Sequence, residues 1–330
     1  MSLSVAIITK NEEANIRRTL ESVKWADEIV IVDSGSTDRT CDIAREFGAK
    51  VFVEGWKGFA AQKNSAIDKC SGDWILSLDA DEEVSADLAT ELKGALLPDD
   101  SIFTERALKN ADSLDRVELI MAVEEAGSIS GVEIVGFRVP RKNYFLGKWI
   151  RYGGYYPDRK LRIIRKGYGE FESRSVHEDI KLKKNFPSDL QSHLIHHAYP
   201  TLSGYIEHMN RYSDLGALML LEKKQGEREA SAESREQSAR AKSLATEPSQ
   251  ETNRYSDLGA QMVADKAQAS FSITNIVLRP LATFIYNYIF RLGFLDGREG
   301  LLLHLYHSVY VSWKYAKAWE LSRNKGVKKE

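Results

Sequence analysis

Short apolar runs alternate with helical patterns over the first ninety residues of the chain. Each run is three to five residues long and is bounded by charged or turn-forming residues, as expected of a buried strand. Strands and helices that alternate at this spacing form a parallel sheet with right-handed crossovers. The pattern therefore predicts an α/β fold with a mostly parallel sheet flanked by helices. The predicted strands are residues 5–8, 29–32, 51–53 and 74–78, and the predicted helices are residues 12–23, 38–47 and 59–69.

The strand pattern is interrupted by residues 98–132, which are polar and carry no strand pattern. We interpret this stretch as an insertion of one or two surface helices. Strand patterns resume at residues 136–141 and 161–164. We therefore expect a single α/β domain over residues 1–200. Its two halves are residues 1–97 and 133–200.

The rest of the chain, residues 201–330, predicts a helical extension with a polar insert at residues 218–260. The stretch 222–251 is rich in Glu, Lys, Arg, Ser and Ala and has no aromatic side chain. It is therefore either a solvated helix or a disordered linker. The eight-residue sequence at 210–217 recurs at 253–260, which indicates a local duplication.

The tail of the chain, residues 271–319, holds eleven aromatic residues with scattered Arg and Lys. It is either a pair of helices that pack into a core or a pair of interfacial helices on an anionic membrane. No uncharged apolar run reaches the ~18 residues that a transmembrane helix needs. We therefore expect at most a peripheral contact with a membrane.

Composition places the chain among globular proteins of a reducing compartment. Hydrophobic residues make up 43% and charged residues 28%, and a net charge of −2 gives no general attraction to nucleic acid. The two cysteines, Cys41 and Cys70, form no disulfide framework. No Cys and His cluster has zinc-finger spacing, and we expect His193, His196 and His197 to form a stabilising polar cluster rather than a metal site. The chain opens on a strand pattern with no secretory leader, so we expect a cytoplasmic protein.

Three carboxylates, Asp79, Asp81 and Glu82, crowd the point where the strand at residues 74–78 ends. Like charges this close repel one another unless a cation lies among them, and Mg²⁺ or Mn²⁺ binds in this way through carboxylates and substrate phosphates. The carboxyl ends of parallel strands are also where open sheets bind ligands. The alternative is that these acids cap the helix that follows.

Asp33 ends the second predicted strand, so the topology brings it close to Asp79 and to the end of the first strand. Its carboxylate can accept hydrogen bonds from a ribose or a base, or it can stabilise the Asp-Ser-Gly-Ser-Thr-Asp turn. Asn11, which follows the first strand, is equally a candidate helix cap. Neither G-x-G-x-x-G nor G-x-x-x-x-G-K-[ST] occurs, which argues against a dinucleotide dehydrogenase and a P-loop NTPase.

Residues 138–184 form a basic region, with fourteen Lys and Arg against five Asp and Glu, and aromatic residues are interleaved with the charges. This mixture suits phosphorylated sugars as well as nucleic acid. Within the region, Glu178 and Asp179 are adjacent carboxylates that a positive environment keeps ionised, so either one can act as a general base. The alternative is ordinary surface charge.

Together these motifs resemble the family 2 glycosyltransferases of the GT-A fold, a Rossmann-like sheet flanked by helices with, here, a helical C-terminal extension. Over about the first ninety residues the resemblance is carried by residues 5–12 (VAIITKNE), 31–38 (IVDSGSTD), 62–64 (QKN) and 78–82 (LDADE). The Gln-x-x-Arg-Trp motif of processive synthases is absent, which favours transfer of one sugar per acceptor. The segments similar to the bacterial lipopolysaccharide core β-1,4-glucosyltransferase branch are residues 147–150, 154–162, 176–178, 291–297 and 313–315.

The resemblance implies an inverting transfer of a single sugar, glucose from UDP-glucose, to a heptose of the lipopolysaccharide inner core. It makes residues 1–97 the nucleotide-sugar half and residues 133–200 the acceptor half of the domain. Asp81 would hold Mg²⁺ or Mn²⁺ on the diphosphate, with Asp79 beside the metal or the ribose. The residues implied in donor binding are Thr9, Asn11, Glu12, Asp33, Lys63, Asp79 and Ala80.

On the acceptor side, the resemblance implies that Glu178 or Asp179 is the base. Arg151, Arg159 and Arg162 suit bidentate contacts with the phosphates of a lipid-linked core oligosaccharide. Such an enzyme would be peripheral on the cytoplasmic face of the inner membrane. The alternatives are a polyprenyl-phosphate glycosyltransferase and a non-catalytic carbohydrate- or membrane-binding module on the same fold. The residues implied in acceptor binding are Trp149, Arg151, Tyr155, Tyr156, Arg159 and Arg162.

Overall fold

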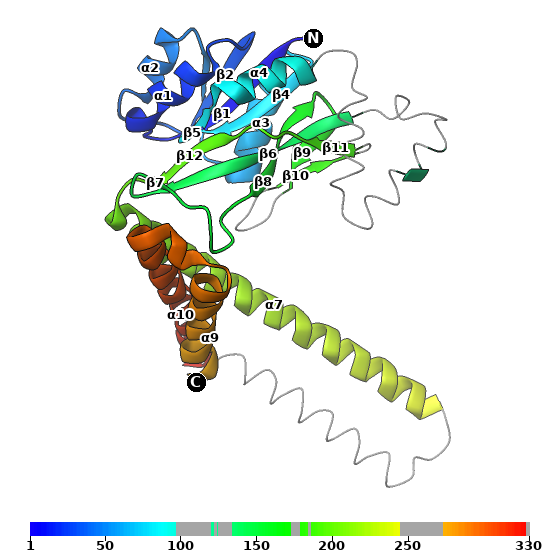
Figure 1. The fold of residues 1–330 in the computed structure, drawn as a ribbon. Helices are drawn as coiled ribbons and strands as arrows, with labels where there is room; N and C mark the ends of the chain where they lie inside the picture. The colour runs from blue at the N-terminus through cyan, green and yellow to red at the C-terminus, as the bar shows by residue number, and fades with distance from the viewer. Residues whose placement is uncertain are drawn as a thin grey trace. The chain divides into compact units, whose positions relative to one another are not determined.

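The computed structural model divides into two compact units, Met1–Pro200 and Thr201–Glu330 (Figure 1). The expected insertion at residues 98–132 lies outside the described residues apart from three positions, and the second copy of the repeat at 253–260 lies outside them entirely. The described residues are 1–96, 120, 121, 124, 134–172, 179–183, 186–244 and 273–327.

A mixed sheet of 10 strands forms the centre of the first unit. Its strands lie in the order β3-β2-β1-β4-β8-β6-β12-β5, and β7 and β11 both pair with β6. The four strands predicted in the first ninety residues are β1 to β4, which pair in parallel, and the mostly parallel sheet is confirmed. The strands β5 and β8 run antiparallel to their neighbours, which the sequence pattern did not indicate. The bounds are β1 (Leu3–Thr9), β2 (Glu28–Asp33), β3 (Lys50–Val53), β4 (Trp74–Asp79), β5 (Glu82–Val84), β6 (Ile134–Phe145), β7 (Lys148–Trp149), β8 (Asp158–Arg165), β11 (Phe186–Asp189) and β12 (Leu194–Tyr199).

Helices cover both faces of the parallel part of this sheet. One face packs against α1, α2 and α4, and the other packs against α3 and a small sheet of β9 and β10. The three predicted helices are α1, α2 and α3 and are confirmed. The bounds are α1 (Glu13–Val23), α2 (Thr40–Glu46), α3 (Phe59–Lys69), α4 (Ala86–Ala95), β9 (Gly169–Phe171) and β10 (Ile180–Leu182).

The two cores meet at the strands, as residues of β1 show. Val5 and Ile7 pack in one core with Leu20 of α1, whereas Ala6 packs in the other core with Ile67 of α3. Successive side chains of a strand point to opposite faces, so a strand covered on both sides needs an apolar residue at every position. This requirement produces the short unbroken apolar runs of the sequence.

The acids after β4 do not cap the following helix. Glu82 begins β5, which pairs with β12, and α4 begins only at Ala86. Its N-cap is Ser85, whose hydroxyl oxygen accepts a hydrogen bond from the backbone nitrogen of Leu88 at 3.2 Å. The capping alternative for Asp79, Asp81 and Glu82 is therefore wrong, because a short strand separates these acids from the helix.

The second unit is helical, as expected from the sequence. The long helix α7 (Leu202–Leu244) packs against α10 (Gly297–Val327), and α10 packs against α9 (Ile273–Ile285). A π-helical segment η2 (Tyr286–Phe290) and a 3₁₀ turn η3 (Gly293–Asp296) join α9 to α10. Of the two alternatives for the polar insert, a helix is correct up to residue 244, and residues 245–272 lie outside the described chain.

We predict that two glycine-to-alanine substitutions in helices of this unit have opposite effects on stability. A Cβ at Gly300 would lie 2.3 Å from the carbonyl oxygen of Gly293 and 2.8 Å from the Cβ of Asp296, whereas a Cβ at Gly226 would meet nothing within 4 Å. Gly300→Ala should lower the free energy of unfolding by about 1–3 kcal/mol through overpacking. Gly226→Ala should raise it by about 0.5–1 kcal/mol through helix propensity. Urea unfolding followed by far-UV circular dichroism measures both, and an unchanged midpoint for Gly300→Ala would contradict the packing at this turn.

Candidate functional site

The side chains that the sequence places at the end of the first strands lie at one edge of the sheet. Thr9 is the register partner of Asp33, and Ile8 is the register partner of Asp79. The neighbouring parallel strands β2, β1 and β4 therefore end almost level with one another. The topology brings Thr9, Asp33 and Asp79 together at this edge.

Asp33 is held by its own loop. Its carboxylate is 1% exposed and accepts hydrogen bonds from Thr9 Oγ1 at 2.8 Å, from the backbone nitrogens of Gly35 at 2.9 Å and Ser36 at 2.7 Å, and from Ser36 Oγ at 2.5 Å. Burial by itself raises the pKa of Asp33, but these hydrogen bonds outweigh burial and hold the pKa below its usual value. Because a carboxylate offers about four acceptor positions, the geometry favours the turn-stabilising alternative for Asp33.

Asn11 joins the loops that follow β1 and β2. Its φ of 55° lies in the left-handed region, its Oδ1 accepts a hydrogen bond from the Thr37 nitrogen at 2.8 Å, and its own nitrogen donates to Ser36 Oγ at 2.7 Å. The N-cap of α1 is Glu12, so the alternative that Asn11 caps this helix is wrong. Asn11 instead fixes the rim of the site, because it ties one loop to the other.

Asp79 lies between two cations. Lys63 Nζ lies 2.8 Å from its Oδ1, and Arg162 Nη2 lies 2.6 Å from its Oδ2. Burial raises the pKa of Asp79, but the charges of Arg162 and Lys63 outweigh burial and hold the pKa well below its usual range. The next residue, Ala80, is buried, and its carbonyl oxygen accepts a hydrogen bond from Thr19 at 2.7 Å. Asp79 is therefore an ionised carboxylate with a cation on each oxygen.

Glu82 binds two arginines and the backbone of Asp79. Its side chain is fully buried, and its Oε1 accepts hydrogen bonds from Arg162 Nη2 at 2.6 Å and from Arg141 Nη1 at 2.9 Å. Its Oε2 accepts one from the Asp79 nitrogen at 3.1 Å, and Arg141 also lies 2.5 Å from Asp158 Oδ2. Arg141 was not predicted as a site residue, because no local sequence pattern links it to Glu82, which lies 59 positions away in the chain.

The position of Arg162 does not match its predicted role in acceptor binding. We expected it to bind the acceptor, but it is only 5% exposed and its guanidinium contacts Asp79 and Glu82. The register between β6 and β8 passes from Leu161 to Ile163, so Arg162 is the extra residue of a β-bulge. A bulge re-aims a side chain, and here it directs the guanidinium to the carboxylates at the end of β4. In this structure Arg162 therefore belongs to the acidic edge of the sheet and not to an acceptor surface.

Asp81 faces a histidine. His196 Nε2 lies 3.4 Å from Asp81 Oδ2, and His196 Nδ1 lies 2.7 Å from Asn143 Oδ1. Burial raises the pKa of Asp81 and lowers that of His196, but their mutual contact outweighs burial, so the pKa of Asp81 falls and that of His196 rises. Burial also raises the pKa of Glu12, against a hydrogen bond from Asn15, and the charge of Asp81 adds to the rise. The like charges of Glu12 and Asp81 therefore act on one another at this edge.

The pair of Asp81 and His196 is the best metal-binding arrangement that the site offers. Within the described part of the chain, no three His, Cys, Asp or Glu side chains converge into a complete metal site. A carboxylate and an imidazole nonetheless suit Mn²⁺, and Mg²⁺ or Mn²⁺ commonly takes further ligands from substrate phosphates. Asp79, the other predicted ligand, already has Lys63 and Arg162 on its oxygens. The geometry therefore favours Asp81 over Asp79 as the metal ligand.

The three histidines of residues 193–197 contact separate partners and form no single polar cluster. The expectation of one cluster is therefore corrected to three pairs. Only the pair of Asp81 and His196 includes a residue of the Asp-x-Asp motif. The sequence could have indicated this pair only through the alternation of side chains along β12, which places His196 and His197 on opposite faces of the strand. The pairs are Tyr156 Oη with His193 Nε2 at 2.7 Å, Asp81 Oδ2 with His196 Nε2 at 3.4 Å, and Glu83 Oε2 with His197 Nε2 at 3.2 Å.

Among the residues predicted on the acceptor side, Trp149 and Tyr156 form an aromatic pair with cations beside it. Their rings meet edge to face with centroids 5.2 Å apart, and Lys142 Nζ and Arg151 Cζ lie 4.7 Å and 4.1 Å from the centroid of the Trp149 ring. Tyr155 is next in the chain to Tyr156, and burial raises the pKa of its phenol. An aromatic surface flanked by cations can bind a sugar that carries an anionic group.

The predicted base lies at a boundary of the described residues. Glu178 is outside them. Asp179 Oδ1 lies 3.6 Å from Lys160 Nζ, and the Asp179 side chain is 52% exposed. Arg159, another predicted acceptor residue, donates to the carbonyl oxygen of Leu190 at 3.0 Å. Asp179 is thus an accessible carboxylate beside a cation of β8.

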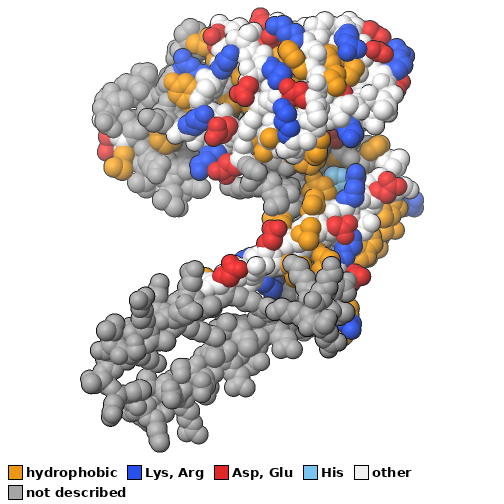
Figure 2. All heavy atoms as spheres, turned by 180° about the vertical axis from the view of Figure 1, so that it is seen from behind, with side chains coloured by type: hydrophobic (Ala, Val, Ile, Leu, Met, Phe, Trp, Pro, Cys, Tyr) orange, Lys and Arg blue, Asp and Glu red, His pale blue; other side chains and the backbone are white. Residues whose placement is uncertain are grey.

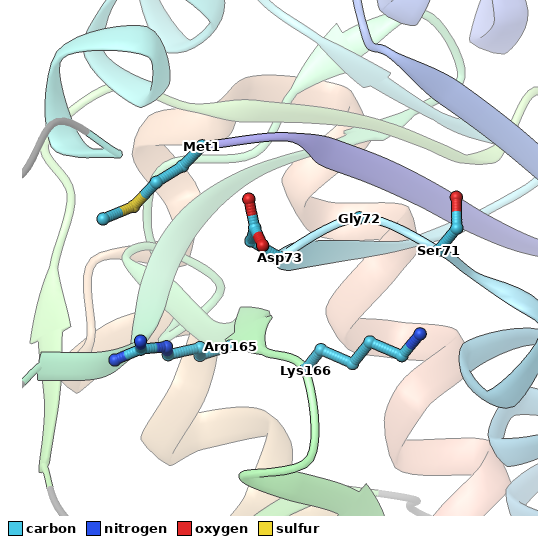
Figure 3. A pocket seen from close by; sticks show the side chains of 6 residues that line it. All are labelled: Met1, Ser71, Gly72, Asp73, Arg165 and Lys166. Carbon is cyan, nitrogen blue, oxygen red and sulfur yellow. The ribbon is translucent and has the colours of Figure 1, made fainter.

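A pocket of about 330 Å³ lies at the opposite edge of the sheet (Figure 3). It adjoins the start of β1, the start of β4 and the end of β8, and it contains none of the predicted site residues. We therefore assign it no part in the site. Its lining residues are Met1, Ser71, Gly72, Asp73, Arg165 and Lys166.

Comparison with solved structures gives low overall similarity. Glucosyl-3-phosphoglycerate synthase from Mycobacterium tuberculosis, in complex with Mn²⁺, UDP and glucosyl-3-phosphoglycerate, is 28% identical, with a TM-score of 0.27 over 29% of this chain and 39% of that chain. TarS from S. aureus is 16% identical, with a TM-score of 0.32 over 64% of this chain and 39% of that chain. The assignment of this protein to a family therefore comes from sequence.

Sequence comparison identifies the family. The sequence model of glycosyl transferase family 2 matches residues 4–166, which include the acidic edge of the sheet. The lipopolysaccharide core biosynthesis glycosyltransferase LpsC of Rhizobium meliloti is 33% identical over 228 residues, 66% of this chain and 71% of that protein. An uncharacterised glycosyltransferase of Rickettsia bellii is 52% identical over 92 residues, 28% of this chain and 31% of that protein. The chain therefore belongs to the family 2 glycosyltransferases, as its sequence motifs led us to expect.

Proposed function

We propose that this glycosyltransferase moves a single sugar, glucose from UDP-glucose, to a heptose of the lipopolysaccharide inner core with inversion at the anomeric carbon. The observation that carries the proposal is the acidic edge of the sheet, where Asp79 lies between Lys63 and Arg162 while Asp81 faces His196. The sequence similarity of the chain to the Rhizobium meliloti core glycosyltransferase supports a core acceptor.

The cations around Asp79 suit a departing diphosphate. Lys63, Arg162 and Arg141 bring three positive charges to one place, where the carboxylates of Asp79, Glu82 and Asp158 pair with them and orient them. As the bond from the anomeric carbon to the phosphate oxygen breaks, negative charge grows on the diphosphate. Fixed cations in a water-poor site stabilise that charge without reorganising. We expect Lys63 to lie nearest the phosphates, because an ammonium can turn from Asp79 to a phosphate by rotation about its side-chain bonds.

Asp81 and His196 would hold Mg²⁺ or Mn²⁺, with Glu12 close by. The metal, when bound, supplies further positive charge to the leaving diphosphate. Asn143 holds the second nitrogen of His196 and so fixes the orientation of the ring, as the partners of metal-binding histidines commonly do. Thr9, Asn11 and Asp33 shape the loops that would receive the nucleoside.

On the acceptor side, the aromatic pair of Trp149 and Tyr156 would hold a core sugar, and Arg151 would contact its anionic group. Glu178 or Asp179 would take the proton from the attacking hydroxyl. The hydroxyl oxygen then bonds to the anomeric carbon as the diphosphate leaves from the opposite side. One displacement of this kind inverts the anomeric centre and needs no covalent intermediate. A lipid-linked acceptor would place the enzyme peripherally on the cytoplasmic face of the inner membrane.

The metal assignment predicts that Asp81→Asn lowers kcat for glucose transfer from UDP-glucose by ~100-fold or more. Without the Asp81 carboxylate the metal is no longer held, so the diphosphate loses the cation that stabilises its growing negative charge. The same variant should lose the Mn²⁺ binding that isothermal titration calorimetry detects in the presence of UDP. Asp42→Asn on α2 is the matched control, since its side chain is 68% exposed and pairs only locally with Arg45. Full transferase activity of the wild type in excess chelator would show the metal role to be wrong.

Because Glu82 positions the two arginines, we predict that Glu82→Gln lowers both the free energy of unfolding and kcat/KM for UDP-glucose. A buried ion-pair network that loses one partner leaves charge uncompensated, so the free energy of unfolding should fall by about 3 kcal/mol. Glu83→Gln, next in the chain with a side chain 30% exposed, should change it by less than about 1 kcal/mol. Urea unfolding and kcat/KM for UDP-glucose are measured on both variants. Equal effects of the two substitutions would disprove a special role for Glu82.

A further inference from the structure

The helix α9 carries its apolar side outward. Leu281 is 53% exposed, whereas the residue before it, Pro280, is buried. The inner side is where α9 meets α10, since Ser312 Oγ donates to the carbonyl oxygen of Ile276 at 2.8 Å and the Arg279 guanidinium lies 5.2 Å from the Tyr315 ring centroid. An amphipathic helix of a soluble domain normally turns its apolar side to the core, so this orientation is reversed.

Two adjoining rows of residues at helical spacing of four make up this outward side. They continue without a break from α9 into the π-helical segment η2. We call these residues, together with the turn residues that follow them, the outer face. The rows consist of Ile273, Val277, Leu281, Ile285 and Ile289, and of Leu278, Ala282, Tyr286 and Phe290, all of them exposed.

The turn between α9 and α10 extends the outer face. Leu292 adopts a left-handed conformation with φ of 59° and is exposed, as are Phe294 and Leu295 in η3. Leu301 and Leu305 on α10 are also exposed and lie one helical turn apart. Figure 2 shows apolar side chains in orange open to solvent on the helices of this unit. An apolar area of this extent on the described surface marks an interaction site.

The exposed charges beside the outer face are positive. Across residues 273–305 the exposed charged side chains are those of Arg279, which contacts α10, and of Arg291 and Arg298, whereas Asp296 is buried and Glu299 is half-buried. Arg291 lies 5.9 Å from the ring centroid of Tyr286, so cation and aromatic ring occur together at the end of the face. This arrangement complements a surface that is apolar inside and anionic at its boundary.

We propose that the outer face lies in the interfacial layer of an anionic phospholipid bilayer, with α9 parallel to the membrane plane. The aliphatic rows enter the acyl boundary, and the arginines contact the phosphates. Among the described helices none has both the length and the apolar character of a membrane span. The anionic bilayer is thus a further partner of the enzyme. This inference rests on the proposed function only for the reason that the enzyme needs a membrane, which is its lipid-linked acceptor.

A second copy of the chain fits the outer face less well than a bilayer does. In a symmetric dimer the same patch contacts itself, so Arg291 and Arg298 of one protomer would approach those of its partner. The two acids of residues 273–305 are not exposed, since Asp296 is buried and Glu299 is half-buried, so neither is placed to compensate these like charges. An anionic bilayer removes this repulsion, because it supplies a negative phosphate for each guanidinium.

Vesicle flotation of the full-length protein tests the proposal without donor or acceptor present, so its outcome is independent of the sugar chemistry. The probes are phosphatidylcholine vesicles with and without phosphatidylglycerol. Leu281→Glu should reduce binding to the anionic vesicles by roughly tenfold or more, because it places a charge in the apolar row. Leu218→Glu on α7, where the leucine is 47% exposed, is the matched control and should bind as the wild type does. Arg291→Gln should weaken binding roughly fivefold and only to the vesicles that contain phosphatidylglycerol.

Three results in binding and assembly would overturn the proposal, and so would a fourth in activity. One is a wild-type protein that does not float with anionic vesicles, and another is equal binding by Leu281→Glu and Leu218→Glu. The third is a wild-type dimer in analytical ultracentrifugation that Leu281→Glu converts to a monomer while vesicle binding is unchanged, which would make the outer face an interface between copies. Far-UV circular dichroism confirms that each variant is folded. Glucose transfer to a detergent-dispersed acceptor by Leu281→Glu should equal that of the wild type, and its loss would assign the outer face to catalysis instead.

Discussion

The buried carboxylate of Glu82 is the constraint on which the site depends. An ionised side chain with no exposure to water must be paired, and Glu82 is paired with Arg141, Arg162 and the backbone of Asp79. Each of these partners then contacts another group of the site. Arg162 contacts the Asp79 carboxylate, and Arg141 contacts Asp158. Because the groups share their partners, a change at Glu82 alters the surroundings of both arginines at once.

The network gives Asp79 and Asp81 different surroundings, although they are only two residues apart in the chain. Asp79 ends β4 among cations, whereas Asp81 lies in the turn to β5 and faces His196 of β12. The first environment gathers positive charge that suits a diphosphate, and the second leaves an oxygen and a nitrogen that suit a metal. A short strand, β5, makes this possible, because its antiparallel pairing with β12 brings His196 to the turn.

The two units of the chain use apolar residues in opposite ways. In the first unit, apolar residues fill both faces of a sheet and leave the polar groups at its edge for chemistry. In the second unit, α9 leaves its most apolar rows exposed, which costs stability in water unless another apolar phase covers them. The bilayer that we propose as the partner of this face would supply that phase.

The sequence alone determined the features that depend on neighbours in the chain. Apolar runs indicated β1 to β4, helical spacing indicated α1 to α3, and the Asp-x-Asp motif after a strand indicated where the acids gather. It could not assign Ser85 rather than the acids as the helix cap, since both are local possibilities and only the pairing of β5 decides between them.

Tertiary structure decided everything that requires distant parts of the chain to meet. Arg162 and Glu82 are 80 residues apart, and they meet because a β-bulge in β8, which no sequence pattern marks, directs Arg162 toward Glu82. His196 reaches Asp81 only because β12 lies next to β5. The sequence also left the exposure of α9 undecided, because an apolar helix has the same sequence whether a protein core or a membrane covers it. Local sequence fixes which side chains a strand end or helix carries, whereas the folded chain alone determines which charge each one faces.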